Sequence, residues 1–170
     1  MFKIEKPANC DFVRYEHKGA FNVVGPQDQM LFPEIPVKLP VVVKKFLEKN
    51  TEIKNTKDSV GYGVSYDSNK EGFTYLFGKE VSKAEDLPEG FVTKEIPEND
   101  YAVISHKGSK EKLKDTYTWF YCSWMPENGQ EHSAQPSFEV YDERYIPARP
   151  GVDTSQSYFE IYLPIKKNSQ

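Results

Sequence analysis

Near the C-terminal end of the sequence, two carboxylates are each followed two residues later by a phenol. Glu139 precedes Tyr141, and Glu160 precedes Tyr162. Because side chains alternate across a β-strand, both members of each pair are expected on one face, opposite apolar neighbours. A carboxylate among aromatic rings is costly to desolvate unless a cation or hydrogen-bond donors compensate its charge. Ring faces attract cations, so this combination predicts a groove that binds a flat or bulky organic cation.

Residues from two other segments are expected to complete this groove. Tyr62, Val64 and Tyr66 lie in the corresponding strand of an internal repeat. Trp119 and Trp124 fall on different sides of a predicted helix; Trp124 belongs to its apolar stripe, so Trp119 is the expected ligand contact. The predicted ligand-binding residues are Glu139, Tyr141, Trp119, Glu160, Tyr162, Tyr62, Val64 and Tyr66. The same alternation also describes an ordinary solvent-facing sheet, and periodicity alone leaves both interpretations open.

The sequence lacks motifs for metal, phosphate or nucleophilic chemistry. His17, His106 and His132 do not show the i, i+4 spacing of a helical metal site. There is no Gly-rich phosphate loop, nucleophile elbow or metalloprotease helix motif. We therefore predict no metal, no cofactor and no catalytic residue, with Glu139 as the candidate if the chain is an enzyme.

The composition is that of one folded cytoplasmic domain. Of the 170 residues, 38% are hydrophobic, which is enough for a core, and no apolar run approaches the length of a membrane span. The N-terminal residues lack the apolar core of an export signal, and Cys10 and Cys122 have no metal or redox spacing. The net charge is -4, without a basic cluster. The expected partner is a small molecule, and direct contact with a membrane or with nucleic acid is not expected.

A weak internal duplication indicates that two copies of one unit make up the chain. Three pairs of matching segments occur in the same order. They are 17–19 with 106–108, both His-Lys-Gly; 64–67 with 139–142; and 72–77 with 158–163. The first repeat covers about residues 1–81 and the second about 91–167, and together they are expected to form a single domain, residues 1–170.

Strand signals occur at matching places in the two repeats. β-Branched and aromatic residues followed by Gly predict a first strand in each. These first strands are expected at 12–17 and 101–106, and the closing strands at 61–67, 73–80, 136–142 and 158–165. Polar and Pro-rich linkers are expected at 27–36, 82–90 and 143–157.

A helix is expected after the first strand of each repeat. In the first repeat, the apolar stretch 41–47 follows Pro40, which suits the first helical turn, and precedes Asn50, which suits the C-terminal end. In the second repeat, apolar residues recur at helical spacing over 113–124, and Pro126 stops the run. The order of elements is therefore βαββ twice, an α+β fold.

Three motifs follow one another in the second half of the chain. They are Trp-Met-Pro-Glu-Asn-Gly at 124–129, Phe-Glu-Val-Tyr at 138–141 and Glu-Ile-Tyr-Leu-Pro-Ile at 160–165. They resemble the GyrI-like family, which includes the effector-binding domains of AraC-type and MerR-type regulators. That family's pattern is Trp-Leu-Pro-x-Ser-Gly, Phe-Glu-x-Tyr and Glu-Ile-Tyr-x-Pro-Ile. Met125 and Asn128 replace the usual Leu and Ser, and neither change touches the expected groove.

The resemblance implies an architecture and a site. The tandem βαββ repeats would form an antiparallel curved sheet with pseudo-twofold symmetry and two main helices on one face. Small compounds, often cationic or aromatic, would bind in the groove between the halves, with Glu139 as its central acidic residue. No helix-turn-helix domain fits before the first strand, so the chain is expected to be a free-standing member.

Three functions are compatible with these features. The first is binding of small cationic or amphipathic aromatic compounds, for sequestration or for sensing through a separate regulatory protein. The second is hydrolysis of reactive cyclopropane-type small molecules, in which Glu139 assists water attack and Tyr141 or Tyr162 donates a proton. The third is inhibition of DNA gyrase by protein binding, although the sequence has no long acidic run that would mimic DNA. The first is our leading prediction.

Overall fold

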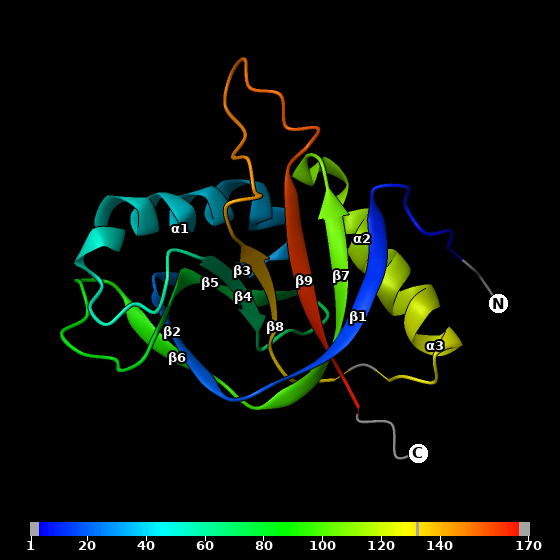
Figure 1. Ribbon diagram of the computed structural model, residues 1–170, viewed down its shortest axis with the longest axis horizontal. Helices are drawn as coiled ribbons and strands as arrows, with labels where there is room; N and C mark the ends of the chain where they lie inside the picture. Colours follow the sequence, from blue (N-terminus) through cyan, green and yellow to red (C-terminus); the bar gives the residue numbers. More distant parts are fainter. Residues whose placement is uncertain (1–3, 132, 167–170) are drawn as a thin grey trace.

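The computed structural model describes residues 4–131 and 133–166, and it contains a curved sheet and two main helical segments (Figure 1). The strands are β1 (Cys10–Lys18), β2 (Phe21–Gly25), β3 (Gln27–Leu31), β4 (Gly61–Tyr66), β5 (Gly72–Val81), β6 (Val92–Ile96), β7 (Asn99–Lys107), β8 (Ser137–Tyr141) and β9 (Tyr158–Ile165). The helices are α1 (Ile35–Lys49), α2 (Leu113–Trp119) and α3 (Met125–Glu127), with a π-helical turn at Phe120–Trp124 between the last two. Short 3-10 turns occur at Phe32–Glu34, Asn50–Glu52 and Lys110–Lys112.

The nine strands form one antiparallel sheet with a symmetric order. The order is β1-β7-β9-β8-β4-β5-β2-β6, and β3 also pairs with β5. The central pair is β4 and β8, one strand from each half, and exchanging the halves about this pair reproduces the order. The predicted α+β fold with tandem βαββ repeats and pseudo-twofold symmetry is therefore confirmed.

The first strand of the first repeat was assigned to the wrong segment. The structure places β1 directly beside β7, with Cys10 opposite His106, so these two strands are neighbours and not equivalents. The counterpart of β7 is the strand pair β2 and β3, which together line β5 as β7 lines β9. Each βαββ unit is thus preceded by an extra strand that pairs with the opposite repeat, because β1 pairs with β7 and β6 pairs with β2. The His-Lys-Gly match at 17–19 and 106–108 does not mark equivalent positions.

The first helix begins earlier than the sequence predicts. It starts at Ile35 with Pro36 in its first turn, and Pro40 lies inside it. Because a residue before proline disfavours the helical conformation, Pro40 gave a false start signal. Asn50 caps the C-terminal end, as predicted. The expected linker at 27–36 instead contains β3, whose polar, exposed residues become a strand only through pairing with β5.

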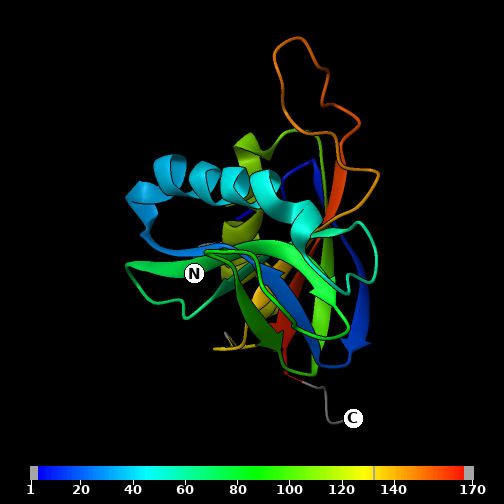
Figure 2. The ribbon, with the colours of Figure 1, turned by 90° about the vertical axis from the view of Figure 1, so that its left-hand side faces the viewer.

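Both helical segments lie on the same face of the sheet (Figures 1 and 2). On that face, α1 packs through Val42 against Met30 and Tyr75, and the second segment packs through Phe120 against β7 and β9. On the opposite face, aromatic rings from β2, β4, β7, β8 and β9 fill the inside of the curve. The sheet therefore separates two hydrophobic cores. The face on which a side chain lies determines which of the two cores it joins.

A surface histidine of β1, His17, contacts the start of β7 and the residue that precedes this strand. The Nδ1 atom of His17 lies 2.7 Å from Asp100, and its Nε2 atom lies 2.7 Å from Glu98. These carboxylates, Glu98 first, raise the pKa of His17. The folded-state pKa is above the unfolded value, so the stabilisation is fully present below the unfolded pKa and is lost as the pH rises through the folded pKa.

We therefore expect His17→Gln to lower the free energy of unfolding more below about pH 6 than above about pH 8. Urea denaturation of both proteins at the two pH values measures the difference. An equal loss at both pH values would mean that the charge of His17 contributes nothing to stability.

Candidate functional site

Glu139 lies on the helix-covered face of the central strand β8, opposite Gly63 of β4 and Ile161 of β9. Its side chain is buried, with 7% of the residue exposed. The hydroxyl of Tyr117, from α2, donates a hydrogen bond of 2.6 Å to one carboxylate oxygen, and the hydroxyl of Tyr141 donates one of 2.5 Å to the other. Two phenols from different elements therefore compensate the negative charge.

Burial and the charge of Glu139 both raise the pKa values of the surrounding phenols. Burial first, and then the carboxylate, raise the pKa of Tyr117 and of Tyr141 well above the ordinary value. The pKa of Tyr75, from β5, is raised in the same way. All three phenols stay protonated at neutral pH, and Tyr117 and Tyr141 donate hydrogen bonds to the carboxylate.

A glycine leaves the space that this cluster needs. A Cβ atom at Gly63 would lie 2.3 Å from the hydroxyl oxygen of Tyr75 and 3.1 Å from a carboxylate oxygen of Glu139. Any larger residue at this position would push the phenol away from the carboxylate. The absence of a side chain on β4 thus allows groups from β5 and β8 to meet.

A cationic side chain occupies the aromatic part of the same region. The Nζ atom of Lys110 lies 4.2 Å from the ring centroid of Tyr141, 5.1 Å from that of Tyr145 and 5.8 Å from that of Phe159. Burial lowers the pKa of Lys110, and the charge of Glu139 opposes this effect. We name these groups the Glu139 cluster, which consists of Glu139, Tyr75, Tyr117, Tyr141, Tyr145, Phe159 and Lys110.

The eight residues predicted from the sequence do not share one face. Glu139 and Tyr141 belong to the cluster, and Trp119 lies on the same side of the sheet. The other five predicted residues lie on the opposite face and are Glu160, Tyr162, Tyr62, Val64 and Tyr66. The strand register is the cause, because Val140, not Glu139, is the direct partner of Glu160 and of Tyr62. The expectation that both carboxylates point into one groove is wrong.

Glu160 is already paired on its own face. Its carboxylate accepts two hydrogen bonds from the Arg14 guanidinium, at 3.0 and 3.2 Å, and one of 2.8 Å from the Tyr158 hydroxyl. Burial raises the pKa of Glu160, but the donors Arg14 and Tyr158 outweigh it, and the pKa lies below its ordinary value. Arg14 also donates to the hydroxyl of Tyr162, at 2.9 Å. These groups form an ion-pair network between β1 and β9.

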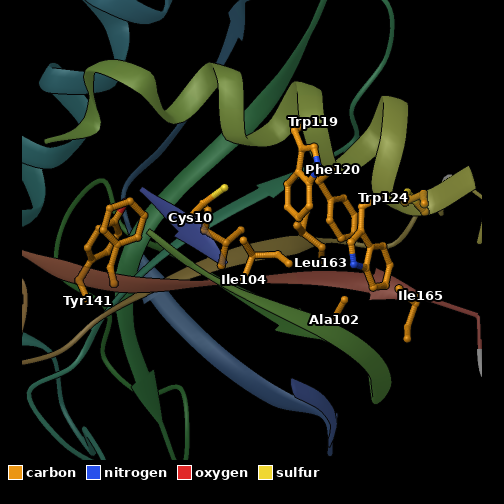
Figure 3. Packing of buried hydrophobic residues seen from close by; sticks show 12 residues of the cluster. Cys10, Ala102, Ile104, Trp119, Phe120, Trp124, Tyr141, Leu163 and Ile165 are labelled. Carbon is orange, nitrogen blue, oxygen red and sulfur yellow. The ribbon is translucent and has the colours of Figure 1, made fainter. Parts of the chain in front are cut away.

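Trp119 belongs to the core between the second helical segment and the sheet. Figure 3 shows Trp119 projecting from the helix toward Leu163, and Trp124 projecting toward Ala102 and Ile165. An ordinary α-helix would place residues five apart on different sides. The π-helical turn at Phe120–Trp124 uses i→i+5 hydrogen bonds, which bring such residues toward one side. Both tryptophans are therefore buried.

Sequence reasoning missed five members of the Glu139 cluster, which are Tyr75, Tyr117, Tyr145, Phe159 and Lys110. Tyr117 lies on the apolar stripe of the predicted helix at 113–124, which was interpreted as core. Tyr75 is one of several aromatic residues in β5, and nothing in the sequence distinguishes it from the others. Lys110 and Tyr145 lie outside the regular strands, where no periodicity predicts the direction of a side chain. The glycine opposite Glu139 in β4 was the available signal for Tyr75, because a strand glycine marks a close approach.

His17 and His106 lie in different surroundings and do not share a partner. His17 is exposed and paired with carboxylates, whereas His106 is buried, with its Nε2 atom 2.8 Å from the carbonyl oxygen of Ser109. His132 lies outside the described residues. Within residues 4–131 and 133–166, no group of three His, Cys, Asp or Glu side chains could hold a metal ion.

A surface cavity of about 490 Å³ lies apart from the Glu139 cluster, between the segment 4–9 and α2. Its lining includes Lys6, Lys112, Glu5 and Asp115, so charges of both signs face it. None of the residues predicted from the sequence lines it. Among the helices that the structure describes, none is long and apolar enough to cross a lipid bilayer.

Several solved structures share this fold. An integron cassette protein of Vibrio cholerae, VCH_CASS2, has a TM-score of 0.60 at 16% identity, over 93% of this chain and 99% of that one. The structure of SAV2435 bound to tetraphenylphosphonium has a TM-score of 0.67 at 12% identity, over 91% and 93% of the two chains. The C-terminal domain of EcmrR has a TM-score of 0.62 at 17% identity, over 91% and 97%. The TM-scores show a common fold, and at these low identities they show the fold alone.

The sequence itself has a more direct relative and a family match. Transcriptional regulator BrlR of Pseudomonas aeruginosa is 30% identical over 154 residues, which are 89% of this chain and 54% of BrlR, so the chain spans about half the length of this relative. The profile of the family Cass2, described as integron-associated effector binding protein, matches residues 18–165. The match covers most of the chain and confirms the resemblance seen in the motifs at 124–129, 138–141 and 160–165. The chain therefore belongs to the Cass2 family of GyrI-like effector-binding domains.

Proposed function

We propose that this protein binds organic cations that carry aromatic groups, and that the Glu139 cluster is the binding site. The observation that carries the proposal is a buried carboxylate with phenol donors beside rings that already hold an ammonium group. The structure of SAV2435 with tetraphenylphosphonium supports it, because that protein shares the fold and its ligand is an organic cation.

The physical basis of selectivity is the combination of charge and rings. Each ring face attracts a cation by about 0.5 to 2 kcal/mol, depending on how far the pair is desolvated. Glu139 adds a full negative charge in a region of low polarity, where electrostatic interactions are stronger than in water. Tyr117 and Tyr141 fix the orientation of the carboxylate, so little ordering is needed when a ligand binds. Neutral molecules of the same shape gain only the apolar contacts.

The proposed site differs from the set predicted from the sequence. It retains Glu139 and Tyr141 and adds Tyr75, Tyr117, Tyr145, Phe159 and Lys110. It leaves out the residues of the opposite face and Trp119, because they form the ion-pair network and the two cores.

The proposed biological role rests on ligand binding by this domain. We propose that residues 1–170 form a single domain that sequesters its ligand, or senses it for a separate regulatory protein. The proposal places this role in the cytoplasm, where a reducing environment suits the free thiols of Cys10 and Cys122.

Calorimetric titration with two ions of matched shape and opposite charge tests the proposal. Tetraphenylphosphonium is expected to bind at least about tenfold more tightly than tetraphenylborate, a difference of ~1.4 kcal/mol. Equal affinity for both ions would mean that the site recognises shape and not charge, and tighter binding of the anion would reject cation recognition.

A further inference from the structure

We infer that the ammonium group of Lys110 is an internal occupant of the cation site, and that an organic cation displaces it on binding. The inference rests on the proposed function, because it concerns the same rings and the same carboxylate. In this arrangement, Lys110 influences the affinity and the charge selectivity of the site, although it makes no favourable contact with the ligand.

The geometry of the rings around Lys110 carries the argument. Three aromatic side chains, Tyr141, Tyr145 and Phe159, surround its Nζ atom at centroid distances of 4.2 to 5.8 Å. Tyr141 also donates the 2.5 Å hydrogen bond to Glu139, so the ring that holds the ammonium is attached to the carboxylate. A ligand cation that uses both Tyr141 and Glu139 therefore competes with Lys110 for the same ring face.

The contacts of Glu139 explain why Lys110 can be released. Among the described residues, Tyr117 and Tyr141 donate the hydrogen bonds that the carboxylate accepts, so Lys110 compensates its charge through space. An ammonium is strongly hydrated, and its burial is costly, as the lowered pKa of Lys110 reflects. A bulky organic cation spreads its charge over a large surface and loses less hydration when it enters. The exchange returns the ammonium to water.

The position of Lys110 in the chain permits this movement. Lys110 begins a short 3-10 turn that follows β7, after Gly108 with a φ of +92°. Its side chain comes from a connecting segment, whereas the carboxylate and the ring of Tyr141 come from β8. Rotation of the long Lys110 side chain toward solvent therefore requires no change in the sheet.

Titration of tetraphenylphosphonium against matched variants tests the displacement. Lys110→Met keeps the length and the apolar stem but removes the charge, so it is expected to tighten binding about tenfold, ~1.4 kcal/mol. Lys110→Arg keeps a positive charge at the same position, and it is expected to bind no more tightly than the parent. Lys114→Met removes the charge of an exposed lysine on α2 and serves as the control, with little change expected.

Each outcome bears on one of the two proposals. Unchanged or weaker binding by Lys110→Met, while Glu139→Gln still weakens binding, would overturn the displacement and leave cation recognition by Glu139 in place. Tighter binding by Lys110→Met together with no effect of Glu139→Gln would support the displacement and reject the role of Glu139. If neither the parent nor Lys110→Met bound the cation, both proposals would be rejected. Circular dichroism spectra that match the parent establish that each variant is folded.

Discussion

Replacement of Glu139 by glutamine is expected to weaken the binding of tetraphenylphosphonium by about tenfold to a hundredfold, which corresponds to ~1.4 to 2.7 kcal/mol and lies in the range for an interaction with a charged group. The substitution keeps the size and shape of the side chain and removes the negative charge. The surrounding rings remain, so a neutral compound such as triphenylphosphine oxide should lose much less affinity.

Glu160→Gln is the matched control for this experiment. Glu160 has the same exposed fraction as Glu139, 7%, and lies on the adjacent strand, but on the opposite face and paired with Arg14. Its replacement is expected to leave cation affinity unchanged. Calorimetric titration of the cation and the neutral compound against the parent and both variants gives the comparison. If the two glutamines had equal effects, or if Glu139→Gln weakened both ligands equally, the charge of Glu139 would not be what selects the ligand.

The Glu139→Gln variant is also expected to be less stable than the parent. A carboxylate without compensation would destabilise the free protein, and its removal would then be neutral or favourable. Here Tyr117 and Tyr141 donate short hydrogen bonds to both oxygens. A glutamine retains one acceptor and replaces the other with a donor, so one phenol loses its partner. A modest loss of stability is therefore expected.

Replacement of Phe138 by alanine is expected to lower the free energy of unfolding by about 3 to 5 kcal/mol, the range for large-to-small changes of buried aromatic residues. Phe138 is 1% exposed at the centre of β8. Its ring centroid lies 4.8 Å from that of Tyr162, 5.2 Å from that of Tyr101 and 5.3 Å from that of Phe21. The cavity would remove contacts with strands from both repeats.

Phe32→Ala is the control for the stability experiment, because the same atoms are removed from a residue that is 49% exposed. Its expected cost is below about 1 kcal/mol. Guanidinium denaturation at equilibrium measures both values. Similar losses in the two variants would show that the aromatic core inside the curve of the sheet does not hold the two repeats together.

The sequence alone determined most of the local structure. Alternation of aromatic and β-branched residues located β4, β5, β8 and β9, and helical spacing located the second helical segment. Two-residue spacing was also sufficient to place Glu139 and Tyr141 together, because side chains two apart in a strand always share a face. These features depend on neighbours along the chain, so they can be inferred without knowing the partners of any strand.

Only the tertiary structure decided how these segments combine. A register difference of one residue places Glu160 and Tyr62 opposite Val140 instead of Glu139, and nothing in either strand alone specifies it. Pairing with β5 turned a polar segment into β3, and the π-helical turn moved Trp119 into the core. The Glu139 cluster draws on β5, β8, β9, α2 and two connecting segments, where side-chain direction follows from packing and not from periodicity. For this reason the sequence located the carboxylate, whereas the fold selected the phenols and the lysine around it.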